Sequence, residues 1–373
     1  MGQQAEIMEL AREIGFDLVG IAPLRPPKGA QLFEDWLQAG HQADMGWFES
    51  QKERILDPRR ILKEGMSLLV LGLSHARPAI HLGAGGRIAR YAAGRDYHNV
   101  IGRMLKKLAK QLREKGLLSA SRAIVDAGPL MERSHAAEAG LGFESKSANL
   151  LHRHIGPWFF LGELILDLDL EPTETPALGS CGTCTACIDA CPTQAIREPG
   201  VVDARLCISY HTIENRGEIP RELRSKLGGW LFGCDVCSEV CPFGQKATGG
   251  EARFGSHAGV EGKTLIEWLL SSKEQLAEPL LGSPLQRAKR DGLARNAALA
   301  LAMQPSERSR ESLLKALEDD PSAMVREAAG WALGQAHAAD EGTQAALERA
   351  CGRAETESER VGLSASLETL GER

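Results

Sequence analysis

The central part of the sequence reads Cys181-Gly-Thr-Cys184-Thr-Ala-Cys187-Ile-Asp-Ala-Cys191-Pro192. A second cysteine run follows, Cys234-Asp-Val-Cys237-Ser-Glu-Val-Cys241-Pro242, and Cys207 stands alone between the two. Eight of the nine cysteines therefore lie in this stretch, and the ninth is Cys351. Cysteines grouped so closely indicate shared chemistry rather than separate structural roles.

The first run has the spacing C-x2-C-x2-C-x3-C-P, which is typical of bacterial proteins that hold two [4Fe–4S] clusters. In those proteins the fourth cysteine of each run ligates the other cluster. The second run, C-x2-C-x3-C-P, lacks a first ligand, and Cys207 lies upstream to supply it. We therefore assign one cluster to Cys181, Cys184, Cys187 and Cys241, and the other to Cys191, Cys207, Cys234 and Cys237.

Two other roles for these cysteines remain as alternatives. C-x2-C pairs also hold structural zinc, although zinc sites do not need a third cysteine or the trailing Cys-Pro. A disulfide framework is typical of small secreted chains, and this chain is large with no secretory signal. Thiolates are soft ligands that suit iron–sulfur clusters, so we expect electron transfer.

Length and composition predict a water-soluble protein of two or three domains. The chain has 373 residues, of which 43% are hydrophobic and 25% charged, with a net charge of −6. No run reaches the roughly 18 apolar residues that a membrane span needs. The N-terminus has no basic and apolar signal-peptide pattern, so we expect a cytoplasmic protein without membrane contact.

The order of predicted elements indicates three domains. Alternating helices and strands predict an α/β domain over residues 1–175. The Thr-Glu-Thr-Pro segment at 173–176 links it to a ferredoxin-like cluster domain at 176–250. Residues 260–373 are predicted to be all-helical and HEAT-like, because Arg295-Asn-Ala-Ala-Leu-Ala-Leu-Ala302 resembles Arg326-Glu-Ala-Ala-Gly-Trp-Ala-Leu333, 31 residues on. Predicted helices cover 3–14, 30–39, 97–115, 131–139 and 263–271, and predicted strands cover 17–24, 67–74, 121–126 and 158–170.

The α/β domain offers three candidate site residues. Asp126 follows a predicted strand and precedes a Gly128-Pro129 turn, which presents a carboxylate at the edge of a sheet. A general acid at this position needs a pKa raised from about 3.9 toward neutrality. Tyr97 and His98 start a helix and are candidate donors beside a cofactor. The alternatives are a turn-forming aspartate and a surface helix cap.

A basic segment opens the helical region. Arg287, Lys289, Arg290 and Arg295 fall within nine residues. Such a group forms either a solvated helix face or a surface that contacts phosphates. The acidic remainder of the chain makes any phosphate binding local and sensitive to salt.

The chain resembles the epoxyqueuosine reductase family from about residue 5 to about residue 335. The motifs that carry this resemblance are Arg90-Tyr-Ala-Ala-Gly-Arg-Asp-Tyr97-His98, Val125-Asp126-Ala-Gly-Pro-Leu-Met-Glu132-Arg133, Ala139-Gly-Leu-Gly142, Trp158-Phe-Phe-Leu-Gly162-Glu163, both cysteine runs, Cys207-Ile-Ser209-Tyr210-His-Thr-Ile-Glu214-Asn-Arg-Gly217, Phe232-Gly-Cys-Asp235, and Ser283-Pro284 with Arg295-Asn296-Ala297.

The resemblance implies cobalamin held between the α/β domain, which is reductive-dehalogenase-like, and the cluster domain. It implies that one cluster passes electrons to cobalt, and that epoxyqueuosine at the tRNA wobble position becomes queuosine as two electrons and two protons remove its epoxide oxygen as water. Asp126 matches the proposed proton donor of the family, and Tyr97 and His98 match residues facing the cobalamin or substrate. Ser209, Asp235 and Arg54 match positions near the corrin.

The resemblance also implies partners. The basic segment would contact the tRNA anticodon arm, and an external low-potential electron donor would supply the clusters of a monomeric protein. Departures from the family pattern occur at Ser145-Lys146-Ser147, at Leu227–Gly233 and at Phe243-Gly244. Two alternatives remain, a dehalogenase-like reductase of a small organic substrate and an iron–sulfur electron carrier without cobalamin.

Overall fold

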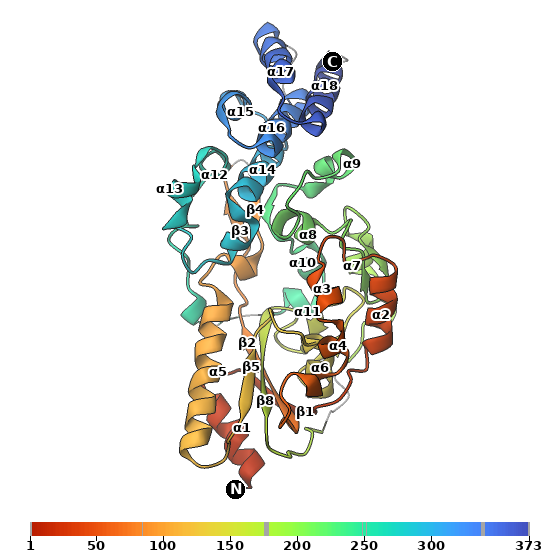
Figure 1. Ribbon diagram of the computed structural model, residues 1–373, viewed down its shortest axis with the longest axis vertical. Coiled ribbons are helices and arrows are strands. Elements are labelled where there is room, and N and C mark those ends of the chain that lie inside the picture. Colours follow the sequence, from red (N-terminus) through yellow and green to blue (C-terminus); the bar gives the residue numbers. More distant parts are fainter. Residues whose placement is uncertain are drawn as a thin grey trace. The chain divides into compact units, whose positions relative to one another are not determined.

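A computed structural model describes residues 2–83, 85–174, 179–247, 249–250, 252–336 and 340–371 (Figure 1). The chain packs into two compact units. The first comprises Met1–Arg77, Arg95–Arg205 and Asp235–Gly255, and the second comprises Pro78–Gly94, Leu206–Cys234 and Ser256–Arg373. The three-domain division stays a prediction, and the predicted link at 173–176 lies partly outside the described residues. None of the described helices is long and apolar enough to cross a membrane.

The first unit is built on a four-stranded sheet with the order β1-β2-β8-β5. Its strands are β1 (Leu18–Pro23), β2 (Ser67–Ser74), β8 (Phe159–Leu166) and β5 (Ser121–Ile124), and every pair is antiparallel. Helices and strands alternate along this unit as predicted, but the sheet is not the parallel one that such alternation favours. Alternation along the chain does not specify strand direction, because it leaves the path of each connection open.

Helices cover both faces of this sheet (Figure 1). Leu69, Leu71 and Leu73 of β2 join the core formed with α1 (Gln3–Ile14) and α5 (Tyr97–Glu114). The intervening β2 side chains join the core formed with α6 (Glu132–Glu138) on the other face. Because successive side chains of a strand point to opposite faces, a strand covered on both sides needs a continuous apolar run, which the segment 67–74 provides.

Short elements complete the first unit. The predicted bounds of α1 and β2 agree with the structure, and the other predicted elements differ at their ends by a few residues. The remaining elements are α2 (Ala30–Gln38), α3 (Trp47–Ser50), α4 (Lys52–Leu56), β6 (Phe143–Glu144), β7 (Leu150–Leu151), α7 (Ala186–Asp189), β9 (Ile196–Glu198), β10 (Val201–Val202), α10 (Val236–Glu239) and α11 (Pro242–Gln245).

The second unit combines a small sheet with helices. β4 pairs with β3 on one side and, in parallel, with β11 on the other. Helices α14, α16 and α18 pack in succession, with α15 and α17 against α16 and α18. The bounds are β3 (Ile80–Leu82), β4 (Gly86–Ile88), α8 (Ile208–Ile213), α9 (Arg221–Arg224), β11 (Trp230–Phe232), α12 (Leu265–Leu270), α13 (Lys273–Ala277), α14 (Lys289–Leu301), α15 (Glu307–Asp319), α16 (Ala323–Ala336), α17 (Glu341–Arg353) and α18 (Glu357–Gly371).

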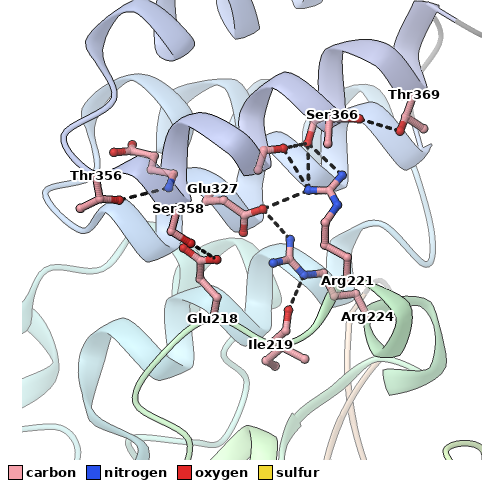
Figure 2. A network of polar contacts seen from close by, with 12 residues as sticks. Glu218, Ile219, Arg221, Arg224, Glu327, Thr356, Ser358, Ser366 and Thr369 are labelled. Atoms are coloured by element: carbon pink, nitrogen blue, oxygen red, sulfur yellow. Dashed lines mark hydrogen bonds and ion pairs between the residues drawn. The ribbon is translucent and has the colours of Figure 1, made fainter.

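A buried ion network ties α9 to the helical array of this unit (Figure 2). Glu327 of α16 is 1% exposed, and its Oε1 accepts hydrogen bonds from Arg224 at 2.8 Å and from Arg221 at 3.1 Å. Arg224 also donates to the Ile219 carbonyl, and Arg221 donates to the Gly362 carbonyl of α18. Two cations share one oxygen of this buried carboxylate, and each guanidinium has a further carbonyl acceptor, whereas Glu327 Oε2 receives no hydrogen bond from the described residues.

Removal of the Glu327 carboxylate is expected to destabilise the second unit strongly. Glu327→Ala leaves the Arg224 guanidinium, which is 2% exposed, without its anion, and breaking a buried pair in this way costs about 3–5 kcal/mol. Urea unfolding followed by helical circular dichroism measures this loss. Glu357→Ala, at an exposed Glu357–Arg360 pair of α18, is the control and should change the free energy of unfolding by less than about 0.5 kcal/mol. Equal effects of the two substitutions would show that the network contributes no special stability.

Candidate functional site

The Asp126 turn lies directly after β5. Asp126 has a φ of 54°, in the left-handed region that a side chain other than glycine seldom adopts. A Cβ on the nearby Gly128 would lie 2.3 Å from Ile124 Cγ2, so the turn also requires glycine there. The backbone is thus held in an unfavourable conformation that presents a carboxylate, a feature that often marks functional sites.

Tyr97 and His98, at the start of α5, both reach the Asp126 carboxylate. Tyr97 Oη donates to Asp126 Oδ2 at 2.5 Å, and His98 Nε2 lies 3.4 Å from the same oxygen. The Tyr97 ring is stacked between His98 and Phe160, with ring centroids 4.2 Å away on each side. The structure therefore brings together the three residues that the sequence singled out in the α/β domain.

Asp96 completes the group as the N-terminal cap of α5. Its Oδ1 accepts hydrogen bonds from the His98 backbone N–H at 2.9 Å and from His98 Nδ1 at 2.8 Å. Sequence reasoning assigned no role to Asp96, although an aspartate before a helix start is a common cap. His98 is thus held between two carboxylates, one at each ring nitrogen.

The electrostatics place the proton on His98 rather than on Asp126. Burial opposes the charge of His98, but hydrogen bonds to Asp126 and Asp96 outweigh it and raise the pKa of His98 to about 9. Burial also acts to raise the pKa of Asp126, yet hydrogen bonds from His98 and Tyr97 make the net shift a lowering. The Asp126 side chain is 59% exposed, which limits the penalty of burial. The raised pKa that a general acid at Asp126 would need is therefore absent in this state of the protein, because His98 supplies a cation beside the carboxylate.

Two further acids lie behind Asp126. The Asp126 backbone N–H donates to Glu132 Oε1 at 2.7 Å, and Glu132 in turn interacts with Glu163 of β8, which is 0% exposed. Both glutamates lie in motifs that carry the family resemblance, and the sequence analysis predicted no role for either. The available indication was Glu163 itself, a single acid within the apolar run of β8.

The other three predicted cofactor contacts lie at three different helices. Arg54 is exposed on α4, where its guanidinium lies 3.5 Å from the Gln51 side chain. Asp235 is buried at the start of α10 in the first unit. Ser209 is partly buried on α8 in the second unit. No contact described here joins these residues to Asp126, and their roles stay predictions.

The structure brings together ligands of the first predicted cluster. The α7 turn, which follows Cys184, packs against α10. Burial, and then the nearby Cys181 and Cys241 thiols, raise the pKa of the Cys187 thiol, so a cysteine of the second run lies beside two of the first. The seven cysteines of the two runs and the intervening Cys207 are free thiols, and none of them forms a disulfide.

Lys146 and Asn149 of the 145–149 loop, together with the Ala195 backbone, place hydrogen-bond donors near the cysteine runs. The Lys146 backbone N–H donates to Cys181 Sγ at 3.5 Å, and its ammonium donates to the carbonyls of Gly182 and Cys184 at 2.8 and 3.0 Å. Asn149 Nδ2 lies 3.7 Å from Cys237 Sγ, and the Ala195 N–H lies 3.3 Å from Cys191 Sγ. Hydrogen bonds to the sulfurs are among the factors that set the reduction potential of an iron–sulfur cluster, so this donor set is compatible with a cluster site.

The second predicted cluster draws on both compact units. Cys191 and Cys237 belong to the first unit, whereas Cys207 and Cys234 belong to the second. The assignment of these four ligands therefore stays a prediction from their spacing.

Most side chains of the basic segment form structural contacts within the second unit. Arg295 is 1% exposed and donates to backbone carbonyls, including that of Asn215 at 3.1 Å. Arg290 forms an ion pair with Asp320, with an Nη1–Oδ1 distance of 2.8 Å. Arg287 is exposed and pairs with Glu214 at 2.8 Å, and Lys289 is exposed. Arg290 and Arg295, two of the four predicted phosphate contacts, therefore bind other groups of the protein.

Two family models match parts of the chain. The model described as a 4Fe-4S double cluster binding domain matches residues 180–244, and the model described as epoxyqueuosine reductase QueG, DUF1730, matches residues 56–127. The first spans the cysteine runs, and the second ends directly after Asp126. Together with the geometry above, these matches define an iron–sulfur oxidoreductase.

Relatives match along most of the chain. The epoxyqueuosine reductase of Xanthomonas campestris is 37% identical over 89% of this chain and 95% of its own length, and that of Pseudomonas aeruginosa is 37% identical over 88% and 92%. A crystal structure of epoxyqueuosine reductase with an epoxyqueuosine-modified tRNA-Tyr stem loop aligns with a TM-score of 0.87 and 27% identity over 98% of both chains. The chain belongs to the epoxyqueuosine reductase family.

Proposed function

We propose that this chain reduces epoxyqueuosine to queuosine in tRNA, with electrons passed through two [4Fe–4S] clusters to cobalamin. The observation that carries the proposal is the convergence of Tyr97, His98 and Asp126 at one constrained turn, in a chain that matches epoxyqueuosine reductases over most of its length. The overall change consumes two electrons and two protons, removes the epoxide oxygen as water and leaves a carbon–carbon double bond.

Asp126 and His98 act as a proton-delivery pair in this reaction. Because the pKa of His98 is raised to about 9, the imidazole is protonated at neutral pH, and its Nε2 lies 3.4 Å from Asp126 Oδ2. Asp126 delivers a proton to the departing epoxide oxygen, and His98 replaces it. Tyr97 fixes the orientation of the carboxylate through its own hydrogen bond, as a positioned acid requires.

The residues of this group are compatible with a corrinoid beside them. Both ring nitrogens of His98 are engaged by carboxylates, so the imidazole serves the proton pair and is not offered as a cobalt ligand. The Asp126 carboxylate is exposed and available to a substrate. Bound cobalamin supplies the reduced cobalt centre that acts on the epoxide. We infer that Arg54, Ser209 and Asp235 contribute further contacts to the cofactor.

Several finer features belong to the same proposal. We infer that α14–α18 form HEAT-like repeats, since the related segments at Arg295 and Arg326 both lie on the helices that stack in succession. Cys191, Cys207, Cys234 and Cys237 hold the second cluster. An external low-potential donor supplies electrons, and the protein acts as a cytoplasmic monomer.

Lys146 is expected to raise the reduction potential of the first cluster. Its ammonium binds two carbonyls of the ligand loop, and a nearby cation favours the more negative, reduced state of a cluster. Lys146→Met should lower that potential by on the order of 50 mV, the equivalent of about 1 kcal/mol. A potentiometric titration followed by electron paramagnetic resonance measures it, with Lys110→Met on the exposed face of α5 as the control. Equal potentials in the two variants would remove this role from Lys146.

We propose that the exposed part of the basic segment contacts tRNA phosphates. Replacement of Arg287 and Lys289 by alanine should weaken binding of an anticodon stem loop and flatten its salt dependence by about 0.9 log unit per lost contact. Fluorescence anisotropy at several salt concentrations measures both. Arg290 is left in place because its pair with Asp320 is structural.

The matched control for this binding experiment is Lys315→Ala, at an exposed lysine of α15. An unchanged salt slope in the Arg287 and Lys289 variant would place the tRNA elsewhere on the protein.

Anaerobic reconstitution tests the proposed cofactor set. Protein treated with iron, sulfide and cobalamin should retain about eight irons and one cobalt per chain, as two four-iron clusters and one corrinoid require. Cobalt spectra should respond when the clusters are reduced. Retention of the irons without cobalt would contradict the proposal and favour an electron carrier.

A further inference from the structure

We propose that Glu132 and Glu163 are positioning residues that form a buried acid latch and hold the Asp126 turn in its working conformation. The proposal rests on the proposed function for the importance of Asp126. The latch itself is defined by the side-chain placement and hydrogen bonds of these three acids.

Glu163 is placed on the α6 face of the sheet. In β8 its neighbours Leu164 and Leu166 pack with α1 and α5, whereas Ile165 packs with α6. Because side chains alternate between faces, Glu163 points to the same side as Ile165. It lies opposite Ile124, the last residue of β5, and α6 begins on this face with Glu132.

The fully buried Glu163 must share a proton with Glu132. Neither oxygen of Glu163 receives a hydrogen bond from a donor among the residues that the structure describes. An ionised carboxylate buried without partners is very costly, so the group stays neutral. Burial, and then the adjacent Glu132, raise the pKa of Glu163 well above its usual range. A neutral Glu163 has one O–H to donate, and the Glu132 carboxylate is the acceptor beside it.

Glu132 connects Glu163 to the Asp126 turn through a hydrogen bond. Its Oε1 accepts the Asp126 backbone N–H at 2.7 Å, at the residue whose φ of 54° is unfavourable. A backbone in that region persists only when its surroundings hold it. The Glu163 proton therefore orients Glu132, and Glu132 holds the turn that carries the acid.

The stability that the raised pKa of Glu132 contributes should fall as the pH rises. Burial, and then the charge of Asp126, raise the pKa of Glu132 to about 7, while the nearby Arg133 opposes this shift. Between the ordinary glutamate pKa of 4.5 and about 7 the folded state binds more protons than the unfolded state, so this part of the stability falls as the pH rises. Above that range Glu132 carries a negative charge next to Asp126. The cations that face the group are Arg133 of α6 and His98 of α5.

Hydrogen exchange of the Asp126 amide in the reconstituted holoprotein tests the latch. At pH 6.5 Glu163→Ala should exchange this amide at least about tenfold faster than the wild type, while Glu163→Gln, which still donates a hydrogen bond to Glu132, should retain the protection. The exposed Glu114→Gln on α5 is the control and should match the wild type.

Equal protection in Glu163→Ala and the wild type would overturn the latch, as would a loss of protection in Glu163→Gln as large as that in Glu163→Ala. If Glu163→Ala does not fold, Glu163→Leu, which fills the site and cannot donate a hydrogen bond, takes its place in this comparison. Exchange is measured without turnover, so a failure of the latch is distinct from a failure of the proposed function, which the turnover of an Asp126 variant reports.

Discussion

The Asp126→Asn variant should retain both clusters and cobalamin, and its turnover of epoxyqueuosine tRNA should fall by a factor of about 10²–10⁴. The amide has nearly the same shape as the carboxyl group and still accepts the Tyr97 hydrogen bond, so the turn should keep its conformation. It cannot take a proton from His98 and pass it to the substrate. The loss should therefore appear in kcat more than in KM.

The same substitution should change the titration of His98. The pKa of His98 is about 9 because Asp126 and Asp96 accept its hydrogen bonds and outweigh the effect of burial. With Asp126 neutral, one of these anions is gone and the pKa of His98 should fall toward its ordinary value of 6.5. Nuclear magnetic resonance of the histidine ring measures this shift. Asp44→Asn, at an aspartate far from this group in sequence, is the control.

Unchanged turnover in Asp126→Asn would refute the role of Asp126 as the acid. A turnover loss without any change in the His98 titration would instead separate the two residues and leave Asp126 to act alone.

Cys241→Ala should abolish turnover by removing the first [4Fe–4S] cluster. Cys241 belongs to the second run, yet it lies close enough to Cys187 to affect the pKa of that thiol, as does Cys181. Loss of this ligand should reduce the iron content from about eight to about four per chain and interrupt the transfer of electrons. Iron analysis and electron paramagnetic resonance measure both effects, and Cys351→Ala on α17 is the control.

The crossed arrangement of ligands makes this prediction specific. Cys181→Ala and Cys241→Ala should remove one resonance, and Cys191→Ala and Cys237→Ala should remove the other. Loss of the same resonance in Cys241→Ala and Cys237→Ala would mean that each run holds its own cluster.

The local features of this chain could be predicted because they depend on neighbours in the sequence. The apolar run at 67–74 specified β2, and the helix predicted over 97–115 begins at Tyr97, as α5 does. The Gly128-Pro129 turn after a strand indicated that Asp126 would be presented at an edge, and the structure brings Tyr97 and His98 to it. Family motifs then suggested what these residues do.

The features that could not be predicted depend on partners distant in the sequence. The antiparallel order of the sheet is set by long connections that leave no short-range pattern. Arg290 and Arg287 looked available for phosphates because Asp320 and Glu214, their partners, lie far along the chain. The lowered pKa of Asp126 likewise follows from His98, which lies 28 residues earlier, and the sequence does not give the distance between them.

The most direct test of the central claim is turnover of an epoxyqueuosine-modified tRNA stem loop by the reconstituted protein under reducing, anaerobic conditions. Nucleoside mass spectrometry should show loss of one oxygen and formation of queuosine when the clusters and cobalamin are both present, and no product when either is left out. Formation of queuosine without cobalamin, or no queuosine with the complete cofactor set, would contradict this account.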